Sequence, residues 1–204
     1  MMVARIPLYP YQSFNDEHKV IFVHIPKNAG SSVLSALGAP ERGRLHIDYS
    51  HYLRSDSERF ARYFKFAVVR DPVSRAISAY RYLIAGGNQS AEDLELGTLI
   101  RKECSTFDGF IQDFLTPSVL ANWDMFRPQS SYICARNGAL MVDIVLHFES
   151  LDEDYQQLRH NIASIAKRLP CVNKSANGTE VSAEQVTLRK IREFYMADYD
   201  QFYS

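Results

Sequence analysis

The sequence has few of the features that crosslink a protein or anchor it in a membrane. Its 204 residues include only three cysteines, Cys104, Cys134 and Cys171, and none of them forms a CxxC pair. A cysteine-based zinc site is therefore not expected, and a sparse, odd set of cysteines is typical of a reducing compartment. No apolar run approaches the roughly 20 residues of a membrane span, and the N-terminus lacks the apolar core of a signal peptide. We therefore expect a cytoplasmic protein without a membrane span.

An excess of charge is also lacking. The 23 lysines and arginines nearly balance the 24 aspartates and glutamates, which leaves a formal net charge of −1. This balance argues against a nucleic-acid partner but is compatible with a local basic pocket. With 46% hydrophobic residues, a chain of this length can bury a large core without disulfides. We expect a single domain over residues 1–204.

Apolar runs separated by helical patterns predict an α/β fold. The expected strands are 19–25, 63–69 and 142–148. The main expected helices begin near 31, cover 72–84 and 151–168, and start again after 182, with weaker helical patterns at 53–62, 97–104 and 107–115 and an acidic loop at 88–97. Ser150 with Glu153, and Ser182 with Gln185, are possible capping boxes. Strands that alternate with helices predict a three-layer α/β/α, P-loop-like fold with a central, mainly parallel sheet.

The first strand leads into the motif "PKNAGSS". Lys27 supplies a mobile positive charge, Gly30 permits close approach of the backbone, and Ser31 and Ser32 add hydroxyl donors. These groups at a strand-to-helix turn suit a phosphate-like anion. The sequence has no Gly-Lys dipeptide, so the nucleotide-binding pattern GxxxxGK[ST] is absent. The alternative is a plain turn with an exposed lysine and two capping serines.

The second strand leads into "VVRDPVSRAISAYRY". Arg70 comes at the strand end, Asp71 and Pro72 are suited to begin a helix, and Ser78 lies on that helix. Arg70 and Ser78 are suited to hold a second anion, whereas Arg75 is expected to be solvated. The alternative is that Arg70 pairs with a carboxylate and Ser78 only packs.

Two anion sites, each at the end of a buried strand, suit a ligand with phosphate groups at both ends. In α/β folds, ligands bind at the carboxyl ends of the strands, and both motifs fall there. Adenosine 3′-phosphate 5′-phosphosulfate (PAPS) has this form, and ATP does not. The pairing therefore favours PAPS over a magnesium–nucleotide complex.

The two motifs carry a resemblance to a known family. "HIPKNAGSS" looks like the 5′-phosphosulfate loop of sulfotransferases, and "VVRDPVSRAISAY" resembles their 3′-phosphate motif. The resemblance is closest to the carbohydrate-type, family 2-like enzymes, which include Golgi and small bacterial members. Weaker similarities at "RPQSSYI", "LHFESLDEDYQQL", "LPCVNKSAN" and "FYMADYDQFY" extend it over residues 19–203. The family loop more often has Thr-Gly-Gly-Thr-Ser after the lysine, where this chain has Asn-Ala-Gly-Ser-Ser.

The resemblance implies a donor site and a reaction. PAPS would be the donor, and no metal would be required. A sulfuryl group would move in line to the hydroxyl of an acceptor, expected to be a carbohydrate, while Lys27 stabilises the leaving phosphate. The residues implied to bind the donor are Lys27, Asn28, Ala29, Gly30, Ser31 and Ser32 at the 5′-phosphosulfate, Arg70 and Ser78 at the 3′-phosphate, and Lys174 and Ser175 in a loop that closes over the nucleotide.

The acceptor hydroxyl needs a base, and histidine suits this role because its pKa lies near working pH. His46 and His51 lie in the polar loop between the two motifs. Related enzymes place a base histidine at a distance from the arginine closer to that of His46, so His51 is the second candidate. Trp123, Arg127 and Gln129 are candidates for the acceptor pocket, because an aromatic ring beside hydrogen-bonding groups often holds a sugar.

Two other functions are compatible with the motifs. One is a P-loop kinase or NTPase, which Mg-ATP binding would reveal. The other is a non-catalytic nucleotide-binding module, which would need neither a base nor an acceptor pocket. The sequence does not identify the acceptor or the oligomeric state.

Overall fold

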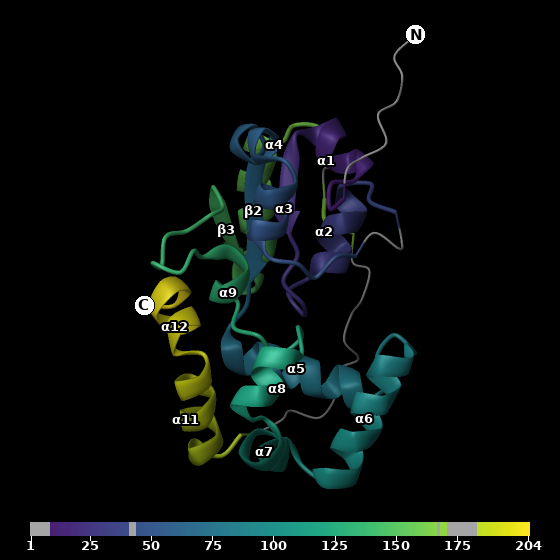
Figure 1. Ribbon diagram of the computed structural model, residues 1–204, viewed down its shortest axis with the longest axis vertical. Coiled ribbons are helices and arrows are strands. Elements are labelled where there is room, and N and C mark those ends of the chain that lie inside the picture. Colours follow the sequence, from purple (N-terminus) through teal and green to yellow (C-terminus); the bar gives the residue numbers. More distant parts are fainter. Residues whose placement is uncertain (1–8, 41–43, 167, 171–182) are drawn as a thin grey trace. The chain divides into compact units, whose positions relative to one another are not determined.

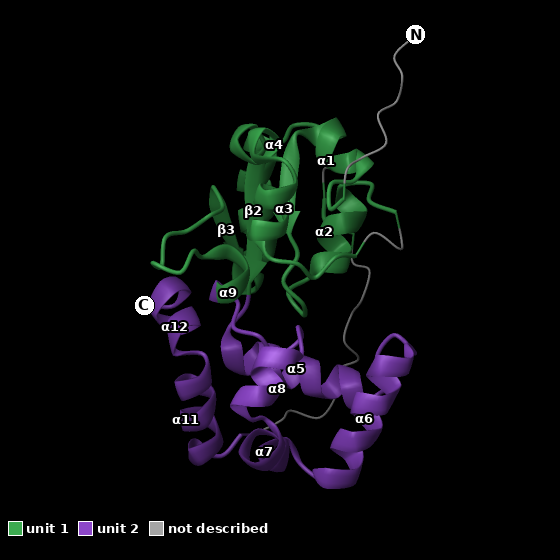
Figure 2. Ribbon diagram, in the orientation of Figure 1, with its two compact units in different colours: residues 1–69, 131–174 green, residues 70–130, 175–204 purple. Residues whose placement is uncertain are grey.

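The chain divides into two compact units, each with its own buried core. The computed structural model describes residues 9–40, 44–166, 168–170 and 183–204. The first unit comprises residues 1–69 and 131–174, and the second comprises residues 70–130 and 175–204 (Figure 2). Two separate clusters of buried hydrophobic side chains lie one in each unit. No described helix is both long and apolar enough to cross a membrane.

The first unit is built on a parallel sheet, which has three strands in the described residues (Figure 1). Their order is β1 (Val20–Val23), β2 (Phe64–Val69) and β3 (Ile144–His147). Phe22 is in register with Phe66, and Ala67 is in register with Val145. Because all three strands run in the same direction, the segments that follow Val23, Val69 and His147 leave from the same edge of the sheet.

Both faces of this sheet are buried. Phe22, Phe66 and Leu146 belong to the cluster that also contains side chains of α1, α2 and α10. Val23 and Ala67 alternate with these residues, point to the opposite face, and are fully buried as well. The buried apolar runs are therefore typical of a layered α/β sheet, and the predicted α/β fold is confirmed. The helices of this unit are α1 (Ser13–His18), α2 (Gly30–Ala36), α3 (Tyr49–Ser55), α4 (Ser57–Arg62), α9 (Ser130–Ile133, mostly in this unit), the 3-10 helix η2 (Phe148–Ser150) and α10 (Leu151–Asn161).

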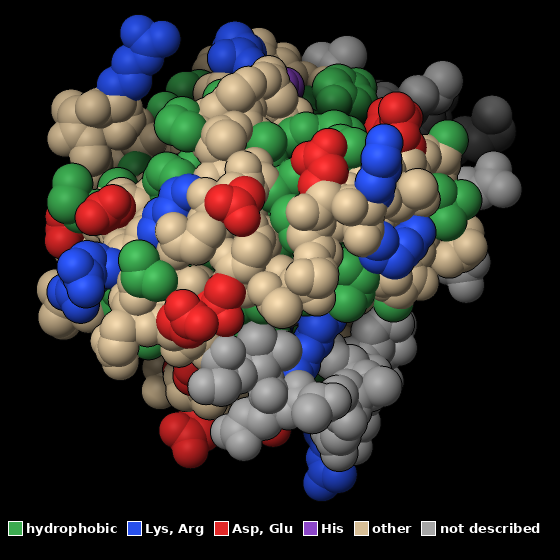
Figure 3. Space-filling model, turned by 90° about the horizontal axis from the view of Figure 1, so that it is seen from below, with side chains coloured by type: hydrophobic (Ala, Val, Ile, Leu, Met, Phe, Trp, Pro, Cys, Tyr) green, Lys and Arg blue, Asp and Glu red, His purple; other side chains and the backbone are tan. Residues whose placement is uncertain are grey.

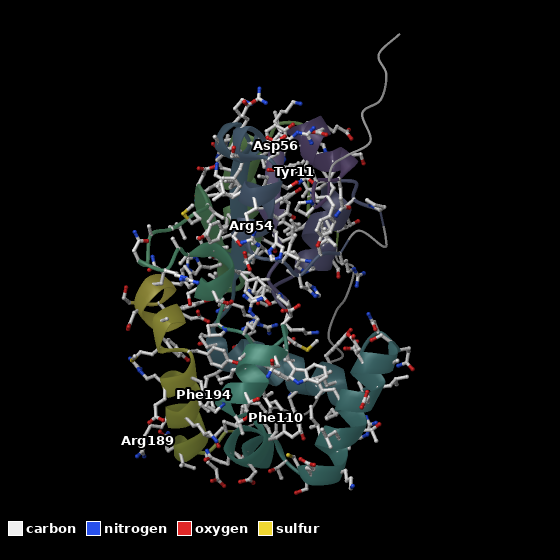
Figure 4. The ribbon with its side chains drawn as sticks, viewed as in Figure 1. Tyr11, Arg54, Asp56, Phe110, Arg189 and Phe194 are labelled. Carbon is white, nitrogen blue, oxygen red and sulfur yellow. The ribbon has the colours of Figure 1, made fainter. Side chains whose placement is uncertain are left out.

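The start of the described chain is fastened to the junction of α3 and α4. The Tyr11 hydroxyl lies within hydrogen-bonding distance of the main-chain oxygens of Tyr52 and Asp56, at 3.2 and 3.1 Å (Figure 4). Asp56 ends α3, and its side chain accepts a hydrogen bond from the main chain of Arg59 to cap α4. One aspartate thus both divides and caps the helical pattern that the sequence predicts as a single helix over 53–62.

The second unit is helical in its described part and has an aromatic core. Phe110 and Phe126 are almost completely buried there, with Tyr80 and Phe107 close by. Figure 4 shows Phe110 among the helices, whereas Arg189 projects outward from α11. The helices of this unit are α5 (Pro72–Ile84), α6 (Ala91–Glu103), α7 (Phe107–Gly109), the π-helix η1 (Phe110–Phe114), α8 (Pro117–Asn122), α11 (Gln185–Phe194) and α12 (Met196–Phe202).

Basic and acidic side chains are interspersed on the face shown in Figure 3. This mixture agrees with the small formal net charge of −1. Apolar side chains also reach the surface of this face, as they do in most folded proteins.

Most predicted elements are present, and α5 has the predicted bounds. Asp71 caps it by accepting from the main chain of Ser74, and Pro72 is its first residue. The predicted acidic loop at 88–97 is wrong: α6 begins at Ala91, where Ser90 caps it and acidic side chains occupy the first turn. Acidic residues there favour a helix because their negative charge interacts favourably with the positive end of the helix dipole.

Three other helix boundaries differ from the sequence prediction. The helix predicted over 151–168 ends at Asn161, and the side chain of Ser150 makes no capping hydrogen bond. Ser182 lies outside the described residues, and Glu184 is the N-cap of α11. The terminal helical pattern is interrupted at Tyr195, whose ring is buried in the core. Tyr195 thus docks this C-terminal segment onto the core of the second unit.

Gly97 lets α6 approach α5 closely, and this contact gives a test of the fold. A Cβ atom at position 97 would lie 2.2 Å from the main-chain oxygen of Leu83. In an exposed helix, Gly→Ala adds roughly 1 kcal/mol of stability. Here we expect Gly97→Ala to lower the free energy of unfolding by about 1–3 kcal/mol, as overpacking does. Urea denaturation measures the change.

Glu95→Ala on the exposed side of the same helix is the control, and it should change the free energy of unfolding by less than about 0.5 kcal/mol. A stabilised Gly97→Ala variant would show that α5 and α6 do not pack as described.

Candidate active site

The loop after β1 adopts an uncommon backbone conformation. Lys27 and Ala29 have φ angles of 71° and 57°, in the left-handed region that residues other than glycine rarely adopt. Backbone that alternates between conformations in this way turns successive N–H groups toward a common concavity, which suits an anion. Left-handed residues of this kind cluster at ligand sites, where the surrounding structure maintains them. The predicted anion loop therefore has the backbone geometry of such a site.

Asn28, between the two left-handed residues, fastens the loop to the sheet. Its side chain is 1% exposed, and its amide nitrogen donates to the main-chain oxygen of Val68 at 2.8 Å. The sequence predicts that Asn28 binds the anion. The structure directs the amide nitrogen of its side chain to β2.

The buried ring of His24 packs against the same loop. It is 6% exposed, and its ring packs so closely on Gly30 that a Cβ atom there would lie 1.7 Å from Nε2. Any side chain at position 30 would therefore displace His24. Burial is the main cause that holds the pKa of His24 well below its usual range, and the electrostatic effects of nearby His46 and Arg44 add to it. His24 is thus a neutral packing group, in agreement with its position on the strand side of the motif.

His46 is brought to the loop through this buried histidine. The ring centroids of His24 and His46 are 4.5 Å apart, and the rings meet edge to face. His46 itself is only partly buried. The structure therefore gathers Lys27, the loop main chain, His24 and His46 in one part of the first unit.

His51 has a different environment. It lies on α3, and its Nδ1 is 3.4 Å from a carboxylate oxygen of Asp48. Burial alone would raise the pKa of Asp48, but hydrogen bonds from Ser50 and the nearby His51 outweigh this and lower it. Asp48 also caps α3. His51 is therefore beside a helix cap, whereas His46 contacts His24, the histidine that packs on Gly30 of the loop.

In the second unit, the side chain of Gln129 holds the main chain of Arg70. The side chain of Gln129 accepts from the Arg70 N–H at 2.9 Å and donates to the Arg70 oxygen at 2.8 Å. Ser78 is half-buried on α5. Gln129 itself is fully buried. Its amide is engaged with the Arg70 main chain, and the binding of the acceptor by Gln129 stays a prediction.

The prediction that Arg75 is solvated is wrong. Arg75 is 2% exposed, and its guanidinium donates to the main-chain oxygens of Arg127 and Met125. The guanidinium of Arg127 is 3.3 Å from Asp124, and Trp123 packs partly buried against the aromatic core. The burial of Arg75 could not be predicted from local sequence patterns, because its two partners lie about fifty residues further along the chain.

The remaining predicted donor residues, Lys174 and Ser175, lie outside the described residues. Of the others, Lys27 to Ser32 and His46 lie together in the first unit, and Arg70 and Ser78 lie in the second. Within the described ranges, no group of three or more histidine, cysteine, aspartate or glutamate side chains is arranged to hold a metal ion.

The hydrogen bond from Asn28 to Val68 gives a test of how the loop is held. Asn28→Ala would leave the buried Val68 oxygen without this donor, so we expect the free energy of unfolding to fall by about 1–3 kcal/mol. Thermal or urea denaturation measures the fall. Ser35→Ala, at an exposed position on the following helix, is the control. Equal stability of the two variants would contradict the described loop.

Comparison with known proteins agrees with the two motifs. A model of the sulfotransferase family matches residues 12–204 of this chain. No curated protein and no solved structure matches the chain significantly. The match covers both anion motifs, the polar loop with the two histidines, and the C-terminal helices. The chain therefore belongs to the sulfotransferase family, whose enzymes transfer a sulfuryl group to an acceptor.

Proposed function

We propose that this sulfotransferase uses PAPS as its donor, transfers the sulfuryl group to a hydroxyl of a carbohydrate, and uses His46 as the general base. The observation that carries the proposal is that the buried His24 packs against both Gly30 of the left-handed loop and His46. A sulfuryl transfer needs charge stabilisation on the leaving side and a base on the acceptor side. The first unit offers a group for each.

The loop from Lys27 to Ser32 would hold the 5′-phosphosulfate. During transfer, the bond between sulfur and the bridging phosphate oxygen breaks, and that oxygen gains negative charge. The Lys27 ammonium and the N–H groups of the loop would stabilise this charge, and the hydroxyls of Ser31 and Ser32 would add hydrogen bonds. Asn28 and His24 keep the loop in place for this task, because the buried Asn28 side chain bonds to β2 and the buried His24 ring packs against Gly30.

Arg70 and Ser78 would hold the 3′-phosphate. A guanidinium offers a planar fork of donors that matches a phosphate group. The Gln129 amide fixes the Arg70 main chain through two hydrogen bonds, which limits where the guanidinium can reach. This support favours a precise anion contact over a solvated surface arginine.

On the acceptor side, His46 would accept the proton of the attacking hydroxyl as the new sulfur–oxygen bond forms. The contacts described above favour His46 over His51, since His51 is tied to the α3 cap through Asp48. The carbohydrate acceptor rests on the family resemblance and on Trp123 with Arg127. The cytoplasmic location expected from the sparse cysteines stays a prediction.

Binding of adenosine 3′,5′-bisphosphate (PAP), the expected nucleotide product, tests the donor site. Because PAP carries a phosphate at each end, the wild-type protein should bind it tightly and should bind Mg-ATP weakly in calorimetric titrations. Arg70→Ala should weaken PAP binding at least about a hundredfold, as expected when a charged contact to phosphate is removed.

Two further variants sharpen this test. Arg70→Lys keeps the charge but loses the fork, so its affinity should be intermediate. Lys102→Ala removes a positive charge from an exposed position on α6, and it should bind PAP like the wild type. A preference for Mg-ATP, or no binding of either nucleotide, would contradict the proposed donor.

Turnover of the His46→Ala variant tests the base. PAP release from PAPS is measured with a panel of mono- and oligosaccharides, and the acceptor with the highest wild-type rate is used for all variants. His46→Ala should lower kcat by roughly 10²–10⁴-fold, the usual contribution of a general base. PAP affinity should stay unchanged, because His46 would act on the acceptor.

His51→Ala is the matched control, and its kcat should stay near the wild-type value. The wild-type kcat/KM should also rise with pH as the base loses its proton, and His46→Ala should lack this rise. Near-normal turnover in His46→Ala, or a large loss only in His51→Ala, would assign the base differently.

A further inference from the structure

The C-terminal helix α12 carries a buried carboxylate that the proposed reaction does not use. Asp198 is 0% exposed. One of its carboxylate oxygens accepts from the main-chain N–H of Gln129, and the other accepts from that of Ser130, each at 2.8 Å. Asp198 thus connects two parts of the second unit that lie about seventy residues apart in the sequence.

A buried carboxylate is costly unless hydrogen bonds compensate its charge. Here the two oxygens face two N–H donors, and such bonds to an ionised acceptor are about twice as strong as neutral ones. The pair of bonds holds the main chain at 129–130 in a fixed place. It also fixes the point from which the Gln129 side chain extends.

The Gln129 side chain contacts Arg70 directly. Its amide is bonded to both the N–H and the oxygen of the Arg70 main chain. Four hydrogen bonds therefore run from Asp198, through Gln129 and its neighbour, to the residue that follows β2. All of these groups belong to the second unit. A shift of the Asp198 carboxylate would reach Arg70 through the fully buried Gln129.

Neighbouring contacts hold the preceding segment at other points of its main chain. The Tyr195 hydroxyl donates to the main-chain oxygen of Phe126 at 2.8 Å. Arg75 donates to the main-chain oxygens of Met125 and Arg127. These contacts stabilise the same region, so they provide a control that separates stability from the position of Arg70.

We propose that Asp198 is a positioning residue that holds Arg70 in place through Gln129, and that it thereby sets the selectivity of the enzyme for nucleotides with a 3′-phosphate. This inference rests on the proposed function, in which Arg70 binds the 3′-phosphate. It assigns to the C-terminal helix a part in donor selection.

The test compares the dissociation constants of PAP and of 5′-AMP, which lacks the 3′-phosphate, by titration calorimetry of the full chain. The dissociation constant of 5′-AMP divided by that of PAP measures the advantage that the 3′-phosphate gives. Asparagine has only one acceptor oxygen, so in Asp198→Asn one of the two main-chain N–H groups loses its acceptor. The ratio should fall by about tenfold, the equivalent of one such hydrogen bond, while the dissociation constant of 5′-AMP stays unchanged.

Tyr195→Phe is the matched control. It removes a buried hydrogen bond between the same C-terminal segment and the same stretch of chain, so it should lower the melting temperature but leave the ratio unchanged. Gln129→Ala removes the link to Arg70 and leaves the Asp198 carboxylate intact. It should lower the ratio as Asp198→Asn does, and it provides the measurement if Asp198→Asn does not fold.

The outcomes separate this inference from the proposed function. If the wild type shows no advantage for PAP over 5′-AMP, the proposed donor site is wrong. If the wild type shows the advantage and Arg70→Ala abolishes it, but Asp198→Asn and Gln129→Ala keep it, only the inference is overturned. Equal weakening of both nucleotides in these two variants would also overturn it, because it would show a general structural role.

Discussion

The hydrogen bond from the Asn28 amide to the Val68 oxygen is the contact on which the site depends. It joins the loop after β1 to Val68, the last residue but one of β2, which ends at Val69. Since parallel strands end at the same edge of the sheet, this bond fixes the loop at the edge where ligands bind in α/β folds. It also holds the loop beside the strand that leads, in the chain, to Arg70. Loss of the bond would leave both the loop and a buried carbonyl without support.

The loop needs this support because its backbone is not in a relaxed conformation. Left-handed backbone at a residue other than glycine costs of order 1 kcal/mol or more, and Lys27 and Ala29 both adopt it. Buried contacts on either side balance the cost: Asn28 bonds to β2, and the His24 ring fills the space against Gly30. The N–H groups are thus oriented before any anion arrives. A loop held in this way loses little entropy on binding, which favours affinity.

Local patterns predicted much of this molecule, and long-range contacts account for most of what they missed. The strands and α5 follow from apolar runs and from the Asp71–Pro72 helix start, which depend on neighbouring residues. The burial of Arg75 and the engagement of Gln129 with Arg70 depend on partners more than fifty residues away, which no local pattern specifies. The wrong loop at 88–97 has another cause, since acidic residues are common both in loops and in the first turn of a helix. The residue types of the site could therefore be predicted, but the groups that position them could not.

The pairing of His24 with His46 bears on how a base can work beside a cationic loop. A histidine that accepts a proton becomes positively charged, so further positive charge close to it opposes protonation. A second protonated imidazole at a centroid distance of 4.5 Å would oppose it further. Burial prevents this, because it keeps the pKa of His24 well below its usual range and the ring neutral. His24 can therefore pack against both the loop and the proposed base while adding no charge of its own. A lysine or arginine at position 24 would bring a charge to this place, and a leucine would lose the flat ring that meets both neighbours.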